Sequence, residues 1–210
     1  MGHVDPKPCT TADGIPFWVR AAAPDDAPAM RRLERHMFES NPFKVTEPGE
    51  NDRDEPAERE WTAQHAANPS WLMLLAADSP EPGAGGGEAF ARLSFRSGNR
   101  RKLAHHGTFG IAVHQRWRAR GLGTALITTL LDWAAAHPTL EKVCLGVFAA
   151  NTGARRLYRR LGFTIEGRSP RHFKLEAGRF DDDITMSIFV KPGLAPERFR
   201  TWPRCGEVKR

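Results

Sequence analysis

Cysteine is scarce in this sequence, and long apolar runs are absent. These two features limit the cellular compartments and the metal cofactors that suit the chain. Only Cys9, Cys144 and Cys205 occur among 210 residues; their wide spacing does not suit metal ligands, and their odd number argues against a disulfide framework. No stretch approaches the ~18 uninterrupted apolar residues of a membrane-spanning helix, and residues 1–10 lack the apolar centre of a signal peptide. We therefore predict a cytoplasmic protein with reduced thiols, no bound metal and no membrane partner.

Acidic residues are outnumbered by basic ones, which gives a net charge of +6 and a calculated pI near 9.6. The length and a hydrophobic content of 40% suit one domain. The charge is uneven, because residues 47–60 hold seven acids against two arginines, whereas residues 96–102 hold four bases and no acid. This balance fits a nucleic acid or an anionic small ligand equally well.

The stretch from Phe109 to Leu126 predicts an anion-binding site. Its first residues alternate as on a strand face, three arginines follow, and helical periodicity begins near Leu122. Gly121 and Gly123 remove side chains where that helix starts. Bare backbone N–H groups at a helix N-terminus, with the helix dipole behind them, favour a phosphorylated ligand.

Two common phosphate-binding signatures are nevertheless absent from this stretch. A nucleotide P-loop needs Lys-Ser/Thr after its last glycine, where this chain has Thr124-Ala125. A dinucleotide fingerprint needs glycine or alanine three residues after the second glycine, where this chain has Leu126. Both ligand classes are therefore disfavoured by a specific residue.

Hydrophobic periodicity predicts an α/β fold with a single mixed, mostly antiparallel sheet and one parallel step across the long central helix. We expect a flexible leader over residues 1–16, one domain over 17–191 and a C-terminal tail over 192–210. Helices are expected at about 24–41, 55–67, 122–137 and 151–161. Strands are expected at about 17–20, 71–77, 89–95, 107–113, 143–148, 163–166, 171–175 and 184–190.

Arg118 to Gly123 matches the Arg/Gln-x-x-Gly-x-Gly/Ala pyrophosphate motif of the GCN5-related N-acetyltransferases (GNAT), and the chain resembles that superfamily. Asn151 to Tyr158, followed by Leu161-Gly162-Phe163, is similar to its second cofactor motif. One helix and one apolar strand separate the two motifs, as in the family. Residues 166–168 and 182–186 resemble the closing strands of its ribosomal-protein, polyamine and small-amine branches.

The resemblance implies that acetyl-CoA is held where two parallel strands splay, here those carrying Ile111–Val113 and Val143–Phe148. Backbone N–H groups near Ile111 and Val113 would polarise the thioester carbonyl, which becomes an oxyanion in the transition state. N–H groups of the glycine loop would hold the pyrophosphate. The cofactor-binding residues implied in this way are Ile111, Ala112, Val113, Arg118, Ala119, Arg120, Gly121, Leu122, Gly123, Thr124, Asn151, Ala154 and Tyr158.

Tyr158, the single tyrosine of the chain, is by the same resemblance the general acid that protonates the departing CoA thiolate. A free phenol has a pKa near ~10 and a thiol near ~8.5, so this transfer is uphill by about 2 kcal/mol. Arg155 and Arg159, within one helical turn, are expected to lower the phenol pKa. The alternative is an aromatic residue that only packs in the core.

The general base is the gap in the resemblance. A neutral alkylamine at pH 7 costs about 4.6 kcal/mol, because its pKa is near ~10.4, and a base should offset this. Many relatives place a glutamate on the strand before the glycine loop, where this chain has Thr108-Phe109-Gly110. The candidates are His105, which titrates in the right range, Glu39 and Glu47. The acids of residues 47–60 could also attract a cationic amine.

Three functions stay open at this point. The first is acetyl-CoA-dependent transfer to a primary amine, on a small molecule, a polyamine or a protein N-terminus. The second is a non-catalytic acyl-CoA-binding protein, suggested by the missing carboxylate. The third is a nucleic-acid or ribosome-binding module that uses the bases of residues 96–102, and it ranks last because no aromatic residues interleave them. A homodimer is left open by analogy alone.

Overall fold

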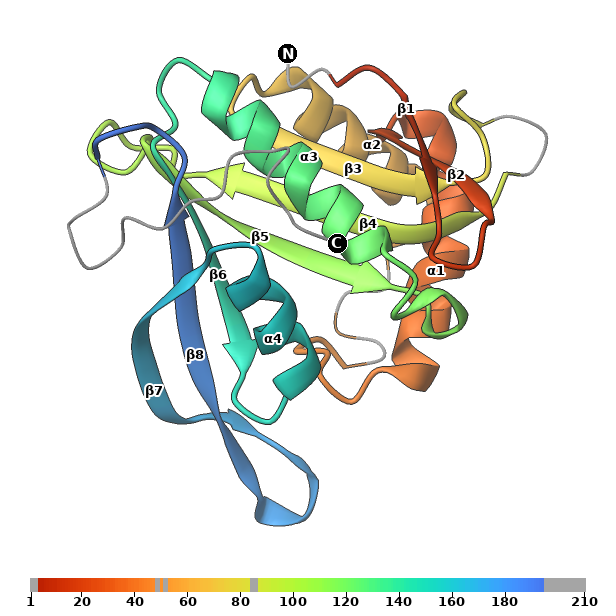
Figure 1. Ribbon diagram of the computed structural model, residues 1–210. Helices are drawn as coiled ribbons and strands as arrows, with labels where there is room; N and C mark the ends of the chain where they lie inside the picture. The colour runs from red at the N-terminus through yellow and green to blue at the C-terminus, as the bar shows by residue number, and fades with distance from the viewer. Residues whose placement is uncertain (1–3, 48–49, 51–52, 84–86, 195–210) are drawn as a thin grey trace. The chain divides into compact units, whose positions relative to one another are not determined.

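The computed structural model of the protein describes residues 4–47, 50, 53–83 and 87–194. Its strands form one eight-stranded sheet in the hydrogen-bonded order β1-β2-β3-β4-β5-β6-β8-β7, accompanied by α-helices (Figure 1). β5 (His106–Val113) and β6 (Lys142–Phe148) run parallel, whereas β1–β2, β2–β3, β3–β4, β6–β8 and β7–β8 are antiparallel. The predicted fold class, a mixed and mostly antiparallel α/β sheet, is confirmed.

The chain divides into two compact units, and β5 contributes to both of them. The first unit comprises residues 1–96 and 110–133, and the second comprises residues 97–109 and 134–210. Across the described residues, no helix has the length and apolarity needed to cross a membrane.

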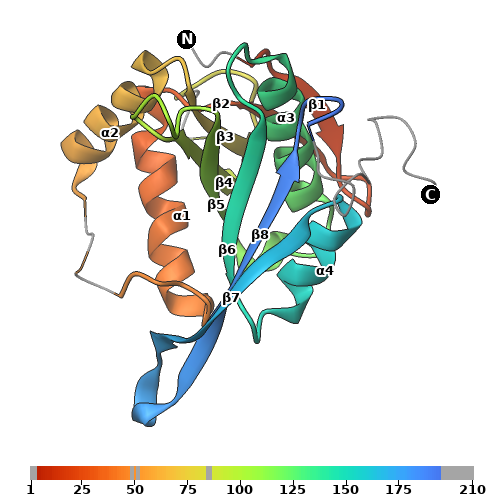
Figure 2. The same ribbon diagram turned by 90° about the vertical axis from the view of Figure 1, so that its left-hand side faces the viewer.

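In the first unit, β2 (Pro16–Ala21), β3 (Trp71–Ala77) and β4 (Ala89–Ser97) build the central layer. α1 (Ala27–Ser40) and α2 (Glu55–Ala67) cover one face, and α3 (Leu122–Ala136) covers the other (Figures 1 and 2). β3 is buried along almost its whole length, as its continuous apolar sequence predicts. α1 begins after a short 3-10 turn, Pro24–Asp26, and packs its apolar face through Met30, Leu33 and Met37.

The first unit also contains a strand that we did not predict. β1 (Lys7–Thr10) pairs antiparallel with β2, with Cys9 opposite Phe17, although residues 1–16 were expected to be a flexible leader. Pairing with β2 supplies the backbone hydrogen bonds, so the strand needs little apolar sequence of its own. Thr11 closes the turn to β2, because its hydroxyl accepts the N–H of Ile15 at 2.8 Å.

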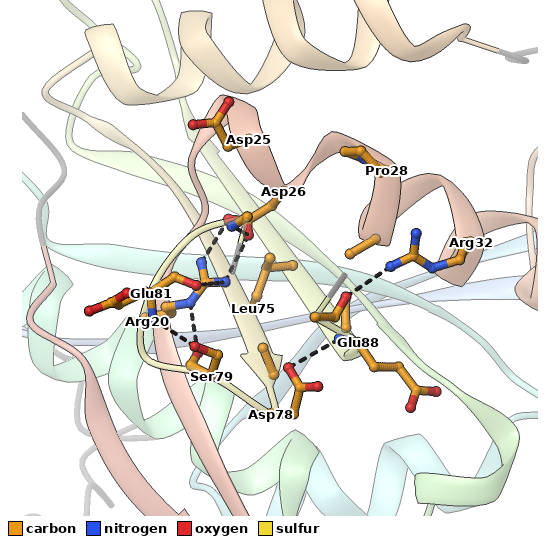
Figure 3. Close-up of a pocket in the computed structure, with 15 residues that line it drawn as sticks. Arg20, Asp25, Asp26, Pro28, Arg32, Leu75, Asp78, Ser79, Glu81 and Glu88 are labelled. Atoms are coloured by element: carbon orange, nitrogen blue, oxygen red, sulfur yellow. Dashed lines mark hydrogen bonds and ion pairs between the residues drawn. The ribbon is translucent and has the colours of Figure 1, made fainter. Parts of the chain in front are cut away.

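A buried ion pair joins β2 to the start of α1 in the first unit. Arg20 and Asp26 form a bidentate pair with two N–O distances of 2.7 Å, and their side chains are only 5% and 3% exposed. Asp26 also accepts the N–H groups of Ala23 and Gly83. Arg20 donates to the Ser79 carbonyl (Figure 3). Both charges are therefore fully hydrogen-bonded within the fold.

In the second unit, β6 pairs with β8 (Phe180–Phe189), which pairs in turn with β7 (Thr164–Lys174). α4 (Thr152–Arg160) follows β6. Its C-cap is Leu161, and the next residue, Gly162, has φ of 91°, a left-handed conformation that glycine adopts freely after a helix. β7 spans both strands that we expected at 163–166 and 171–175. Its register shifts twice, and Arg171, with φ of 53°, lies in the second irregular stretch.

The described part of the C-terminal region ends at residue 194. The predicted tail over residues 192–210 therefore lies almost entirely outside the described residues, and the domain boundaries at 17 and 191 stay predictions.

Candidate functional site

The glycine loop of the first unit connects β5 to α3 through a short 3-10 turn, Gln115–Trp117. Ala119 has φ of 61° and Gly121 has φ of 100°, so the backbone reverses sharply just before the helix. His114 fixes the start of the loop. Its ring Nδ1 accepts the backbone N–H of Arg116 at 3.2 Å, and its backbone N–H donates to the Phe90 carbonyl.

The N-terminus of α3 presents backbone donors at the end of this loop. Its first hydrogen bond runs from the Ala125 N–H to the Gly121 carbonyl at 3.0 Å. The N–H groups of Leu122, Gly123 and Thr124 precede this bond and lack helical partners by geometry. The Leu122 side chain is buried and anchors the turn, whereas Gly121 is exposed. The loop therefore has the form of an anion site.

The arginines of the loop are partly committed to the fold. Arg118 donates from Nε to the Val113 carbonyl at 3.2 Å, which ties the loop back to the end of β5. Arg120 pairs with Asp13 at 2.8 Å, and its guanidinium lies 5.4 Å from the Trp117 ring centre. Arg118 thus remains an exposed candidate for phosphate binding, while Asp13 offsets the charge of Arg120.

The end of β5 carries the three residues expected to contact pantetheine, and Ile111, Ala112 and Val113 are all half-buried there. β5 pairs in parallel with β6 at three positions: His106 with Lys142, Gly107 with Val143, and Thr108 with Cys144. β5 and β6 both continue beyond these three registers. This ending of the ladder is the feature expected of a splayed parallel pair.

In the second unit, Asn151 caps α4 by accepting the Ala154 N–H at 3.1 Å. The cap that we predicted is therefore present, and a contact between Asn151 and a cofactor remains a proposal. Ala154 lies half-buried in the first turn of the helix. Arg155 turns back to donate to the Ala149 carbonyl at 2.8 Å, which fixes the connection between β6 and α4.

Tyr158 lies on the buried face of α4, with 6% of its surface exposed. Its ring packs edge-on against Phe109 at 6.0 Å and Phe163 at 5.9 Å between ring centroids. Burial raises the pKa of Tyr158 to about 12. The expectation that Arg155 and Arg159 lower this pKa is wrong, because desolvation by the apolar neighbours dominates and no arginine effect opposes it.

We predict that the raised pKa of Tyr158 can be measured directly, because the chain has one tyrosine. Phenolate absorbance near ~295 nm should titrate with a midpoint near pH 12 in the folded protein, and near ~10 in denaturant. Since the folded state keeps its proton longer, the free energy of unfolding should fall as pH rises from ~10 to ~12. A folded-state midpoint near ~10 would contradict the described burial.

Of the three candidates for a general base, His105 alone lies in the same unit as Tyr158. His105 is exposed in the turn before β5, about 13 Å along that strand from Phe109, the neighbour of Tyr158. Glu47 is exposed between α1 and α2 in the first unit. The side chain of Glu39 lies outside the described part of the structure. All three roles stay proposals.

Three of the six described acids of residues 47–60 hold α2 in place. Asp54 caps α2 by accepting the Ala57 N–H at 2.9 Å, and Glu55 pairs with Arg59. Glu58 is buried and pairs with Arg53 at 2.7 Å and with Arg92 on β4 at 3.0 Å. Their charges are thus largely neutralised within the fold, which weakens the expected attraction for a cationic amine.

Sequence reasoning missed a pocket of about 400 Å³ in the first unit. His36 of α1 and His114 stack there with ring centroids 3.8 Å apart. Burial, and then the neighbouring His36, lower the pKa of His114, which favours its neutral form. The two histidines lie far apart in the sequence and fit no motif, so only their neighbours in space single them out. The pocket is lined by Ala29, Arg32, Leu33, His36, Glu88, Ala89 and His114.

Residues 28–163, more than half of the chain, match the family described as "Acetyltransferase (GNAT) family". The chain belongs to the GNAT family. The matched segment contains the glycine loop, α4 and Tyr158. Both the predicted superfamily and the prediction of an N-acetyltransferase enzyme are confirmed.

Two curated N-acetyltransferases are similar to this chain over part of their length. The L-amino acid N-acetyltransferase AaaT of Escherichia coli K12 is 26% identical over 63% of this chain and 76% of its own length. The spermidine N(1)-acetyltransferase of the same organism is 30% identical over 43% of this chain. The chain spans about half of that second relative, 48% of its length.

Solved structures show the same fold. A GNAT acetyltransferase from Streptococcus pneumoniae has a TM-score of 0.74 and 25% identity, over 82% of this chain and 99% of its own. The acetyltransferase yncA from Salmonella typhimurium, solved with its cofactor acetyl-CoA, has a TM-score of 0.70 and 19% identity, over 86% and 98% of the two chains. The second likeness supports the fold alone.

Proposed function

We propose that this protein transfers the acetyl group of acetyl-CoA to a primary amine by direct attack in a ternary complex. The observation that carries the proposal is the glycine loop. It has the GNAT pyrophosphate sequence, a backbone turn at Gly121 that suits glycine, and helix N–H donors directly behind it. The reaction class, acetyl transfer, follows from the family. What we propose beyond it is that acetyl-CoA is the donor and a primary amine the acceptor.

The chain supplies three kinds of group for the donor. The N–H groups from Arg118 to Thr124 would bind the pyrophosphate, with Arg118 as an exposed cation nearby. Backbone donors of Ile111 to Val113 would hold the pantetheine and the thioester carbonyl. Asn151 and Ala154, at the first turn of α4, would border the same arm. No described residues form a group of three or more potential metal ligands, and the proposed reaction uses none.

The chemical step forms a C–N bond and breaks the C–S bond, while one proton leaves the amine nitrogen and one proton reaches the departing sulfur. The amine nitrogen attacks the thioester carbonyl, the carbonyl oxygen becomes an oxyanion, and the C–S bond then breaks. In the proposed step Tyr158 donates its hydroxyl to the departing thiolate. No described residue hydrogen-bonds to that hydroxyl, so it is available for this role. Its high pKa keeps the phenol protonated at neutral pH, which a donor requires.

The acceptor is proposed to be a primary amine on a small molecule or a peptide. One relative acts on L-amino acids and another on spermidine, according to their names, which agrees with a small amine. The protein N-terminus is kept as a third acceptor. A cytoplasmic location stays a prediction, as does a homodimer.

The nucleic-acid alternative is weakened by the environment of Arg96. Its Nε donates to Nε2 of His65 at 3.2 Å, and its guanidinium lies over Trp61 and Trp71 at 5.5 and 4.9 Å. The other three bases of this run, Arg100, Arg101 and Lys102, are exposed in the turn. The acyl-CoA-binding alternative is motivated by the missing acid at Thr108–Gly110, and an activity assay separates it from the proposal.

The deciding experiment measures CoA release from acetyl-CoA across L-amino acids, polyamines, aminoglycosides and N-terminal peptides. The proposal expects release that depends on one amine class, with N-acetylated product by mass spectrometry. Binding of acetyl-CoA without release by any amine would support the non-catalytic alternative. A lack of acetyl-CoA binding would overturn both.

We predict that Gly121→Val weakens acetyl-CoA binding by about 5- to 100-fold, because a β-branched residue at this positive φ costs about 1–3 kcal/mol. Gly178→Val is the matched control. It has a positive φ of 72° in the turn between β7 and β8, and, like Gly121, has open space around its Cβ position. Calorimetric titration should show lost affinity in the first variant only. Equal affinity in both variants would remove the glycine loop from the donor site.

A further inference from the structure

Three consecutive aspartates open β8, and they differ in how their carboxylates are satisfied. Successive residues of a strand point to opposite faces, so Asp181, Asp182 and Asp183 do not form one cluster. Asp181 accepts the N–H of Ala150 at 3.1 Å and the N–H of Asp182 at 2.8 Å. Asp182 accepts from Arg168 at 2.6 Å and from the Arg171 N–H at 2.7 Å. Both carboxylates are structural.

Asp183 is the exception among the three. Its Oδ1 is buried and has no hydrogen-bond partner among the described residues. Its Oδ2 has one long contact, from the Thr185 hydroxyl at 3.4 Å. A buried carboxylate oxygen without a donor is costly, and such groups in native structures need an explanation. No described cation pairs with Asp183, so the fold itself does not satisfy its charge.

The surroundings of Asp183 suit a cationic amine. Asp183 lies opposite Phe148 on β6 and opposite Ser169 on β7, and partners across a sheet share a face. Phe148 stacks on Phe173 with centroids 3.7 Å apart, which sets an aromatic wall on the same side. An ammonium group is recognised by a carboxylate through charge-assisted hydrogen bonds and by aromatic rings through cation–π attraction.

Gly146 on β6 lets the Asp183 carboxylate lie against the strand. A Cβ at Gly146 would lie 2.9 Å from Oδ1 and 3.4 Å from Oδ2 of Asp183, whereas Gly146 itself is exposed. Because those atoms are the far end of a side chain, an alanine here should fold but displace the carboxylate. A substitution at Gly146 therefore gives a second way to perturb the Asp183 carboxylate.

Asp183 is also next to the second cofactor motif within the same unit. The Ala149 N–H donates to the Asp182 carbonyl at 2.9 Å, and Ala150 donates to Asp181. These two residues directly precede Asn151, the cap of α4. The start of β8 is thus bonded to the segment that leads into the helix carrying Tyr158.

We infer that Asp183 is the residue that binds the ammonium group of the acceptor amine, an inference that rests on the proposed acetyl transfer. The carboxylate accepts hydrogen bonds from the ammonium group, and Phe148 and Phe173 flank the alkyl chain next to it. The amine is then held by the second unit next to the segment that leads into α4, and Asp183 selects cationic amines over neutral nucleophiles. This acid lies on a different strand from the carboxylate that many relatives carry before the glycine loop.

The test compares Asp183→Asn, Gly146→Ala and the control Glu176→Gln, which removes an exposed carboxylate in the turn after β7. Initial rates are measured with spermidine, phenethylamine and L-phenylalanine. Asp183→Asn should raise the KM of the best amine by about 10-fold or more, the scale of losing a charged hydrogen bond. Gly146→Ala should raise it in the same direction, and Glu176→Gln should not change it. The KM for acetyl-CoA should stay constant in all three.

A stability measurement separates amine binding from a structural role. If Asp183 binds substrate, Asp183→Asn removes the charge of a carboxylate whose buried Oδ1 has no described donor, and the melting temperature should hold or rise. A fall in melting temperature with an unchanged amine KM would overturn the inference and make Asp183 structural. If the wild type releases no CoA with any amine, the proposed acetyl transfer is wrong. The role of Asp183 in amine binding is then still tested by titrating spermidine into the wild type and Asp183→Asn. Equal spermidine affinity in the two proteins would also overturn the inference.

Discussion

Replacing Tyr158 with phenylalanine is expected to lower kcat for acetyl transfer by about 100-fold, with little change in the KM for acetyl-CoA. The substitution keeps the ring between Phe109 and Phe163 and removes only the hydroxyl. Since that hydroxyl has no described partner in the fold, stability should be unchanged or slightly higher. The loss would therefore report on the reaction and not on folding.

The size of the expected effect follows from the pKa of about 12 that burial gives Tyr158. Complete proton transfer to a thiolate of pKa near ~8.5 would be uphill by about 5 kcal/mol. We therefore expect Tyr158 to stabilise the developing thiolate mainly by donating a hydrogen bond, which places the effect at the low end for acid catalysis. The pH–rate profile should show no limb from Tyr158 between pH ~7 and ~10.

Phe163→Leu is the matched control for this prediction. Phe163 is buried against Tyr158 but carries no hydroxyl, so the variant should lose stability by about 1 kcal/mol and keep most of its kcat. Single-turnover release of CoA checks both variants at saturating acetyl-CoA. Full turnover by Tyr158→Phe would leave Tyr158 with a packing role alone.

Local signals allowed much of the fold to be predicted from the sequence. The observed bounds of α2 and β3 agree with the predicted ones, because Asp54 and Asn68 terminate α2 through contacts within a few residues. Asn151 and Gly162 delimit α4 in the same way. The glycine loop could also be predicted, since its sequence, its turn and its helix start are contiguous in the chain.

What could not be predicted depends on partners distant in sequence. β1 becomes a strand only because β2 offers it an edge, and β7 stays one strand because β8 pairs on both sides of its irregular stretch. Burial raises the pKa of Tyr158, and Phe109, one of the rings packed against it, lies on β5 and not on α4, so the nearby arginines misled the prediction. Asp183 gave no local sign of its unsatisfied oxygen, because it is one of three consecutive aspartates and only the fold gives the other two their close donors.

Replacing Asp26 with asparagine is expected to lower the free energy of unfolding by about 3–5 kcal/mol. The asparagine keeps the shape of Asp26 but leaves the Arg20 guanidinium, whose side chain is 5% exposed, without its bidentate partner. An uncompensated buried charge is far more costly than the loss of the pair's net attraction. Urea unfolding followed by fluorescence and circular dichroism gives the measurement.

The adjacent Asp25 provides the control, because it pairs with Arg59 at a similar distance of 2.7 Å but at 73% and 40% exposure. Asp25→Asn should cost about 1 kcal/mol or less, since water already screens this pair. The double variant Arg20→Met with Asp26→Leu should recover most of the loss, because it removes both charges together. Equal costs for Asp25→Asn and Asp26→Asn would show that burial does not set the energy of these ion pairs, and would contradict the described packing of β2 against the start of α1.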